Sequence, residues 1–218
     1  MMDFIRARGE EQKNIRIQQI LDAAAELYEK IGYDKITFSK IGKLLNFTRI
    51  NLYYYFSCKE DIFLLLLRHD IEELVKDAES TFTKPAAEIE LFIDEWAALV
   101  MRHQRMLALF SIANTILLRG ATDGAHAEFR AHIFSLFKKL EKSVHVALPE
   151  MDAKAVSFFV DLENSYAMAL YPASIEYKKS QAIVIFTDVG FGTRNFVPQY
   201  VAYLKILLNG LLNYKGKL

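Results

Sequence analysis

Cysteine and proline are scarce in this sequence, and neither sign of charge is in excess. The single cysteine, Cys58, excludes an internal disulfide and fits a reducing compartment. The 27 basic and 27 acidic residues give a formal net charge of zero, so the chain as a whole is not a polycation. With 4 prolines, 9 glycines and 52% hydrophobic residues, the composition is that of a helix-rich globular protein.

Long apolar runs are missing as well. The most apolar windows, DIFLLLLRHD and YLKILLNGLLNY, are too short to cross a bilayer, and the polar opening MMDFIRARGEEQKN is unlike a secretory signal. We therefore expect a soluble, cytoplasmic protein. The five histidines have no cysteine or paired acid at ligand spacing, so we expect no metal site and no cofactor.

Apolar residues recur at three- and four-residue steps along most of the chain, which predicts amphipathic helices. A first helix should end before Gly32, and later helices are expected over 38–45, 49–56, 60–82, 86–102, 105–119, 124–147, 152–171 and 198–213. Pro149, Pro172 and Pro198 punctuate the last three. Within 173–197, the run AIVIF (Ala182–Phe186) is β-branched enough for a strand, and DVGFGTRN reads as a loop.

The stretch TFSKIGKLLNFTRINLYYYF carries more aromatic surface than a core needs. A helix capped by Thr37 would bury Phe38, Ile41, Leu44 and Leu45, and Asn46 can end it in the left-handed conformation. A second helix, capped by Thr48, would place Leu52, Tyr55 and Phe56 on the face toward the first. Its opposite face carries Ile50, Tyr53 and Tyr54, flanked by Arg49 and Asn51. Burial cannot explain that outward face.

A DNA major groove would explain it. Arg49 can reach guanine O6 and N7, Asn51 can pair with adenine, and Ile50 can lie against a thymine methyl. Tyrosine hydroxyls, with Thr37 and Lys59 at neighbouring helix starts, can hold phosphates. Five Lys or Arg and one acid lie between Tyr33 and Lys59, so the local potential is positive although the whole chain is neutral.

The run TFSKIGKLLNFTRINLYYYFSCKEDIF resembles the DNA-binding motif of TetR-type transcriptional repressors. Its ending Leu52-Tyr53-Tyr54-Tyr55-Phe56 matches the Leu-Tyr-x-Tyr-Phe pattern of their recognition helix, and Lys59-Glu60 matches the pair that starts the next helix. Two positions depart from the family pattern: Asn46 stands where a glycine is usual, and Ile50 where a small residue is usual. The likeness covers about the first 65 residues.

The resemblance implies an all-α protein with a helix-turn-helix domain over 1–60 and an effector-binding and dimerisation domain over 61–218. It assigns DNA binding to Thr37, Thr48, Arg49, Ile50, Asn51, Tyr53, Tyr54 and Lys59. The last two long helices should form the homodimer interface, with Val156, Phe159, Val160, Leu204, Leu208, Leu211 and Leu212 as candidates. Candidates for the lining of an effector pocket are Trp96, Met101, His103, Met106, Phe110, Phe134, Phe137, Phe158 and Tyr166, although such apolar stripes are more often ordinary core.

These expectations add up to a homodimeric repressor that binds a near-palindromic operator, is released by a small-molecule effector, and is not an enzyme. Two alternatives remain. One is a regulator of the same kind that answers to a protein partner. The other is an all-α small-molecule carrier or enzyme with an incidental helix-turn-helix, although a carrier has no use for the outward Ile50, Tyr53 and Tyr54.

Overall fold

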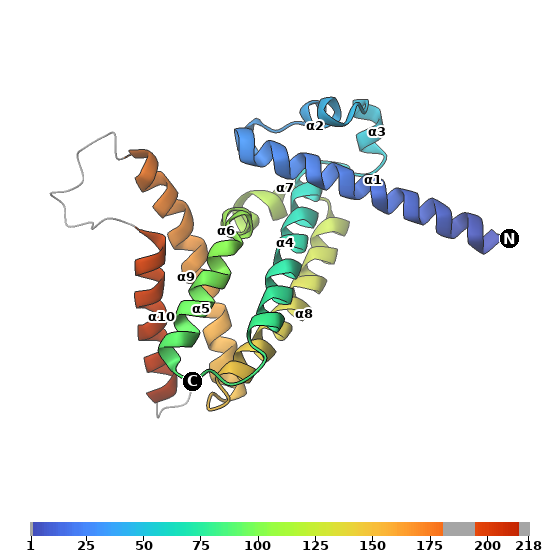
Figure 1. The fold of residues 1–218 in the computed structure, drawn as a ribbon. Helices are drawn as coiled ribbons and strands as arrows, with labels where there is room; N and C mark the ends of the chain where they lie inside the picture. The colour runs from blue at the N-terminus through green and yellow to red at the C-terminus, as the bar shows by residue number, and fades with distance from the viewer. Residues whose placement is uncertain (1, 181–194, 214–218) are drawn as a thin grey trace. The chain divides into compact units, whose positions relative to one another are not determined.

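A computed structural model describes residues 2–180 and 195–213 (Figure 1). All secondary structure within these ranges is helical, which confirms the predicted fold class. The two readings of the 181–194 region, a strand at Ala182–Phe186 and a following loop, lie outside the described residues. None of the described helices is long and apolar enough to span a membrane.

The α-helices follow one another with short connections. They are α1 (Met2–Ile31), α2 (Phe38–Leu45), α3 (Arg49–Tyr53), α4 (Lys59–Thr81), α5 (Ile89–Arg102), α6 (Gln104–Ser111), α7 (Leu118–Gly120), α8 (Asp123–Ala147), α9 (Ala153–Ser180) and α10 (Phe196–Asn213). A 3-10 turn spans Tyr33–Lys35, and a π-helical segment spans Ala113–Leu117. Gly32 ends α1 with φ 73°, as its position in the sequence predicts.

The chain divides into two compact units. The N-terminal unit consists of Met1–Arg68 and Ala113–Arg130, and the C-terminal unit consists of His69–Ile112 and Ala131–Leu218. The segment 113–130 is thus part of the N-terminal unit although it lies far along the chain. Hydrogen bonds attach it there: the backbone N–H and the hydroxyl of Thr122 both donate to Asp61, at 2.8 and 3.1 Å. The predicted domain boundary after residue 60 stays a prediction.

Within the N-terminal unit, α1, α2 and α3 pack around Ile20, Ile41 and Leu52, which have no exposed surface. Asn46 takes the left-handed conformation after α2 (φ 55°, ψ 34°), as predicted. Sequence reasoning missed Gly42, where a Cβ would approach the carbonyl oxygen of Phe47 to 2.7 Å. The tight turn between α2 and α3 therefore needs a glycine one turn before the asparagine.

Two expectations for this unit were wrong. The helix expected over 49–56 ends at Tyr53, and residues 54 and 55 form a turn. Leu44, expected on the buried face of α2, is exposed. The second error follows from the first. Because α3 is only five residues long and buries a single residue, Leu52, it covers less of α2 than a longer helix would.

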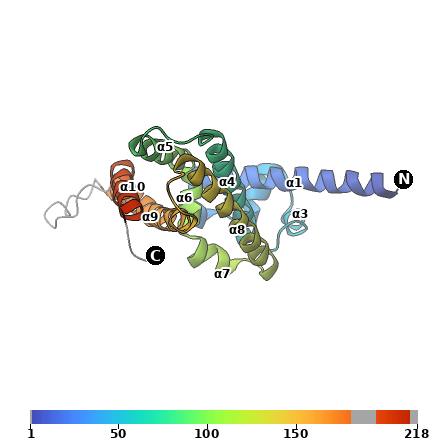
Figure 2. The same cartoon turned by 90° about the horizontal axis from the view of Figure 1, so that it is seen from below.

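In the C-terminal unit, α10 packs on α9 and α5, and α6 packs on α9 (Figure 2). A cluster of rings forms its core, with centroid distances of 5.2 to 5.7 Å among Phe82, Phe92, Trp96 and Phe159. The expected helix end at residue 171 was wrong, because α9 continues through Pro172 to Ser180. Buried neighbours on both sides of the proline, Tyr171 and Ser174, tie this part of the helix into the unit, and such packing overrides propensity.

Candidate nucleic-acid interface and ligand cavity

The start of α3 is fixed by a reciprocal cap. The hydroxyl oxygen of Thr48 accepts from the backbone N–H of Asn51, and the side-chain oxygen of Asn51 accepts from the backbone N–H of Thr48, both at 3.2 Å. This cap lets a five-residue helix form where length alone would not support one. It also occupies the Asn51 side chain, which the sequence assigned to adenine.

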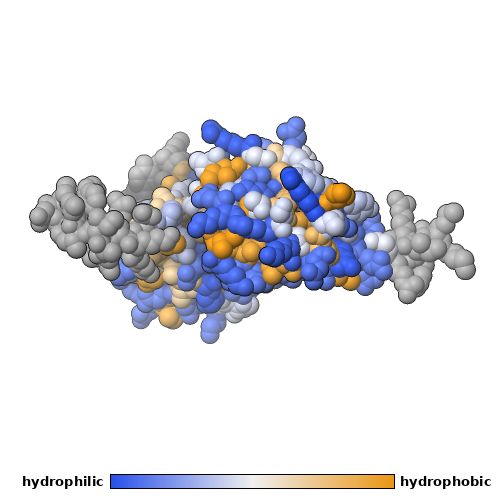
Figure 3. Space-filling view, turned by 90° about the horizontal axis from the view of Figure 1, so that it is seen from above, coloured by the Kyte–Doolittle hydropathy of each residue, from blue (hydrophilic) through white to orange (hydrophobic). Residues whose placement is uncertain are grey.

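The outward face of α3 is exposed as predicted. Ile50 is 82% exposed, Tyr54 78% and Tyr53 47%. Figure 3 views the molecule from the side on which α2 and α3 lie, and there apolar side chains alternate with hydrophilic ones instead of merging into one patch. Ile50 and Tyr54 therefore bury little of their surface within their own unit.

Arg49 and Tyr53 form a pair on this face. The guanidinium donates from Nη2 to the tyrosine hydroxyl at 2.8 Å and lies 5.3 Å from the ring centroid. The ring of Tyr53 also contacts Phe38 at 4.8 Å between centroids. Successive contacts therefore support the arginine above the core of the unit, so it is positioned before any partner binds.

An open groove lies beside this pair. Four residues predicted to bind DNA line it, namely Thr37, Arg49, Tyr53 and Lys59. Sequence reasoning missed Ser39 and Ser57, which also line it and add two hydroxyl groups. Ser39 lies two residues after the helix cap Thr37, and Ser57 lies two residues before the start of α4. The other predicted residues, Thr48, Ile50, Asn51 and Tyr54, are exposed on α3 and its ends.

Lys59 is braced at the start of α4. Its ammonium lies 4.1 Å from the centroid of the Tyr33 ring and within 3.5 Å of the carbonyl oxygens of Tyr33 and Ile36. Tyr33 in turn donates its hydroxyl to Glu60 at 2.6 Å, and burial with this bond raises the pKa of Tyr33 far above its usual range. The lysine charge is thus held at the edge of the groove by partners that stay neutral.

Cys58 next to Lys59 is an ordinary thiol. Burial raises the pKa of Cys58 to about 11, and the thiol donates to the carbonyl oxygen of Gly120 at 3.3 Å. A neutral thiol at physiological pH is a poor nucleophile. Its role in this structure is to attach segment 113–130 to α4.

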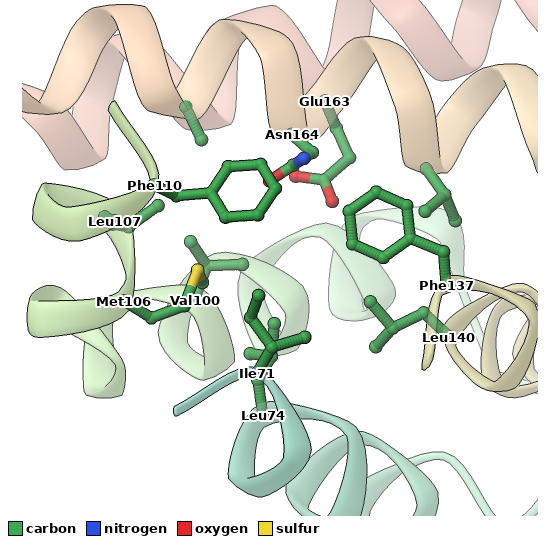
Figure 4. Close-up of a pocket in the computed structure, with 12 residues that line it drawn as sticks. Ile71, Leu74, Val100, Met106, Leu107, Phe110, Phe137, Leu140, Glu163 and Asn164 are labelled. Atoms are coloured by element: carbon green, nitrogen blue, oxygen red, sulfur yellow. The ribbon is translucent and has the colours of Figure 1, made fainter. Parts of the chain in front are cut away.

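The C-terminal unit contains a narrow cavity between α4, α5, α6, α8 and α9, with room for about one water molecule. Three of the nine residues predicted to line an effector pocket contribute to it: Met106, Phe110 and Phe137 (Figure 4). Glu163 and Asn164, which were not among the predicted residues, reach the cavity from α9. A signal was available, because Glu163 follows Val156, Phe159 and Val160 on one apolar stripe of that helix.

The other predicted pocket residues lie elsewhere. Trp96 belongs to the ring cluster of the core, and His103 contacts Asp77 at 3.0 Å through Nε2. Tyr166 stacks on Tyr203 of α10 with centroids 3.9 Å apart. Met101 is half-buried, and Phe134 and Phe158 are exposed. These six do not line the cavity.

Most residues predicted for the dimer interface are buried within one copy of the chain. Val156, Phe159, Val160, Leu204 and Leu208 are at most 2% exposed, whereas Leu211 and Leu212 are half-buried. Side chains that are already packed inside one copy cannot form the surface that meets another. That α9 and α10 form a dimer interface stays a prediction, and periodicity alone could not separate a core stripe from an interface stripe, because both have the same period.

Two short helices joined by a tight turn, with the second helix exposed on its outward face, have the arrangement of the helix-turn-helix class of proteins. Residues 20–66 match the model described as bacterial regulatory proteins of the tetR family, and residues 68–215 match the tetracyclin repressor-like C-terminal domain. The chain belongs to the TetR family.

Two curated relatives share part of this chain. The fatty acid metabolism regulator protein of Bacillus subtilis is 30% identical over 97 residues, which is 44% of this chain and 48% of that protein. The HTH-type transcriptional regulator QacR of Staphylococcus aureus is 46% identical over 55 residues, which is 25% of this chain and 28% of that protein. The matches thus span about half of one relative and about a quarter of the other.

Solved structures resemble the chain over nearly its whole length. FadR of Thermus thermophilus, a TetR family transcriptional repressor in complex with lauroyl-CoA, has a TM-score of 0.59 and 17% identity over 93% of this chain and 98% of that one. The fatty acid degradation regulator FadR of Bacillus halodurans has a TM-score of 0.53 and 18% identity over 91% of this chain and 95% of that one. At such identities the likeness establishes the fold alone.

Proposed function

We propose that this chain is a homodimeric, sequence-specific DNA-binding repressor that a small molecule releases from a near-palindromic operator. The observation that carries this proposal is the outward face of α3, where Ile50 and Tyr54 are largely exposed and Tyr53 is 47% exposed. A recognition helix enters the major groove with such a face, and family membership makes DNA the expected partner.

The side chains proposed to bind DNA fall into two groups: those placed to contact bases and those placed to contact phosphates. Ile50 is placed for contact with a thymine methyl, and Arg49 for guanine once it leaves the Tyr53 hydroxyl. Lys59, Thr37 and the tyrosine hydroxyls flank them, where they would meet phosphates. Asn51 caps α3, so we assign it a positioning role in place of base contact.

For the homodimer we propose the exposed faces of α9 and α10. Ile206 on α10 is 74% exposed, and Phe158, Leu162 and Val197 are exposed on the same two helices. An isoleucine of this kind on the last long helix is costly to leave in water, and two copies of the face would cover it. A twofold pair of α3 helices then requires two half-sites.

The effector would act through the C-terminal cavity. Because the cavity is narrow, a ligand must select or create a more open arrangement of the helices around it. The lauroyl-CoA complex of one structural neighbour makes a ligand with an apolar portion a reasonable starting point for this chain. We further propose that the chain has no catalytic activity, because the cavity lining is almost wholly apolar.

A regulator that answers to a protein partner remains the second candidate, and the small size of the cavity favours it. The two candidates agree on DNA and differ on the signal. A binding measurement with small molecules separates them.

The test of the proposal is selection of bound duplexes from a random library by the purified protein at near-physiological salt. We expect recovery of a near-palindrome with two half-sites. A matched selection with Ile50→Glu, which places a negative charge on the reading face without disturbing the core, should recover nothing. Enrichment of the same sequences by both proteins would contradict the proposed reading face.

A further inference from the structure

An acid lies inside the apolar cavity of the C-terminal unit. Glu163 on α9 is 4% exposed, and it is the only ionisable residue among the described residues that line the cavity. Most of the lining is aliphatic: Ile71, Leu74, Val100, Leu107, Leu140 and Val160. Burial of a carboxyl group costs free energy, so an acid that lines an apolar cavity is a candidate for recognition of a ligand.

Two aromatic rings flank the carboxyl group. Figure 4 shows it reaching from α9 to the space between Phe110 and Phe137, whose ring centroids are 6.2 Å apart. The faces of aromatic rings attract positive charge, as a carboxylate does. A cation in this space would gain from both, and the rings would also contact its apolar substituents.

The carboxyl group is positioned but not saturated. The hydroxyl of Tyr200, on α10, donates to its Oε2 atom. A carboxylate has about four acceptor sites, so capacity remains for a donor from the cavity. Burial raises the pKa of Glu163 to about 7, against the opposite effects of the Tyr200 hydroxyl and the Trp96 indole. The group can therefore lose its proton when a positive charge arrives.

From this juxtaposition we propose that the cavity binds a lipophilic cation, a molecule with an apolar body and one positively charged nitrogen. The nitrogen lies against Glu163, beside the rings of Phe110 and Phe137, and the apolar body lies along the aliphatic lining. The inference rests on the proposed function for the role of this molecule as the effector, but not for its binding. A ligand with an anionic end finds no basic partner among the described lining residues.

The rings are also the means of entry. Phe110 and Phe137 are half-buried, and Met106 beside them has a flexible side chain. Rotation of the two rings would enlarge a cavity that holds about one water molecule. Binding then separates α6 from α8, the two helices that carry the rings.

The first experiment compares two ten-carbon probes of opposite charge, decyltrimethylammonium and decanoate, both below their micelle concentrations. Calorimetry or the fluorescence of Trp96, the single tryptophan, reports binding to the full chain. We expect the cation to bind at least about tenfold tighter than the anion. Equal affinities, or tighter binding of decanoate, would overturn the inference.

A substitution then tests the acid itself. Glu163→Gln keeps the shape of the side chain. It should lower the affinity for the cation about tenfold and change the affinity for decanoate by less than about twofold. Glu79→Gln on α4, an exposed glutamate, is the matched control and should change neither. If Glu163→Gln fails to fold by circular dichroism, Phe137→Leu replaces it and should lower cation affinity more than decanoate affinity. Unchanged cation affinity in the folded variant would sink the inference.

Proton release gives a readout that packing changes would not imitate. At pH 6 the cation should displace about one proton from the wild-type chain, measured by calorimetry in buffers of different ionisation enthalpy, and none from Glu163→Gln. Uptake or absence of a proton in the wild type would contradict the role of Glu163.

Binding to a selected duplex separates this inference from the proposed function. Cation binding by a chain that binds no duplex would overturn the repressor and leave the cavity assignment standing. Duplex binding by a chain that ignores the cation would overturn the cavity assignment alone.

Discussion

The outward face of α3 and the cavity of the C-terminal unit both depart from the rule that apolar side chains are buried and charged ones exposed, but in opposite directions. On α3, Ile50 and Tyr54 lie in solvent although they are large and apolar. In the cavity, Glu163 lies out of solvent although it is acidic. Each exception is supported by ordinary neighbours, Leu52 beneath the first and Val160 beside the second. Such local conflicts with packing mark the sites of binding in a fold that is otherwise consistent.

The largest effect should come from the buried side of α3. Leu52→Ala removes the one residue that the helix buries completely, and we expect it to lower the free energy of unfolding by about 2–5 kcal/mol. Ile50→Ala, two residues earlier on the exposed side, should change it by less than about 0.5 kcal/mol. Urea unfolding followed by circular dichroism measures both. Similar losses for the two variants would mean that Ile50 is packed in solution.

The cavity should give the chain a characteristic pH dependence. The folded-state pKa of Glu163, about 7, is above its unfolded value, so the folded chain binds the extra proton between roughly pH 4.5 and 7. This contribution to stability is complete below the unfolded pKa and is lost as pH rises through the folded one. We expect about 1–3 kcal/mol less stability at pH 8 than at pH 5 from this group. Tyr200 and Tyr203, the titratable neighbours, stay protonated because burial raises the pKa of both.

Glu163→Gln is the control for that dependence. The variant should lose the pH-dependent part of the unfolding free energy, while the contributions of exposed groups remain in both proteins. Urea titrations at pH 5 and pH 8 measure the difference. The same change in unfolding free energy between pH 5 and pH 8 in both proteins would show that Glu163 is ionised, or solvated, throughout this pH range.

Base reading should depend on Arg49 more than on its neighbours. Arg49→Ala should cost about 1–3 kcal/mol at one base position and relax the preference there, while other positions stay selective. The variant also removes the partner of the Tyr53 hydroxyl, so Tyr53→Phe serves as the control for that bond. A binding-site selection on each variant measures the outcome. An unchanged base preference in Arg49→Ala would assign the arginine to phosphate.

The cap of α3 should have a smaller effect. Thr48→Ala removes the hydroxyl that accepts from Asn51, with an expected cost of about 1 kcal/mol in unfolding free energy. Thr48→Ser keeps the acceptor and should cost a fraction of that. Thermal melting of the two variants gives the comparison. Equal melting temperatures would show that the hydroxyl does not support the helix.

Lys59 should affect DNA binding uniformly. Lys59→Ala should weaken all duplexes alike and reduce the slope of log affinity against log salt by about one. Because the ammonium also contacts Tyr33 and Ile36, Lys59→Arg is needed as the variant that keeps the charge. Titrations at several salt concentrations measure the slope. An unchanged slope in Lys59→Ala would exclude a phosphate contact.

Local signals predicted the N-terminal unit well. The helical period identified Leu52 as buried and Ile50 and Tyr54 as exposed, and Asn46 was expected in the left-handed conformation that it adopts. Periodicity could not place the end of α3, because a turn at residues 54 and 55 ends the helix while the apolar spacing continues to Phe56. It also misplaced Leu44, which depends on how much of α2 the next helix covers.

The C-terminal unit was harder to predict from the sequence, because its details depend on contacts between residues that are far apart along the chain. Pro172 would end an isolated helix, yet α9 continues past it with buried neighbours. Val156 and Leu208 were assigned to a dimer interface and lie in the core of one copy, since both surfaces repeat at the same spacing. Glu163 is a charged residue within an apolar stripe of the sequence, which makes it unusual, but only the fold shows which cavity it enters.

Hydrogen exchange tests the central claim, that the outward face of α3 meets DNA, most directly. The amides of Phe38–Tyr53 would be compared by mass spectrometry with and without a selected duplex, with a scrambled duplex as control. The account predicts slower exchange in α2 and α3 with the selected duplex alone. Protection confined to the C-terminal unit, or equal protection by both duplexes, would contradict it.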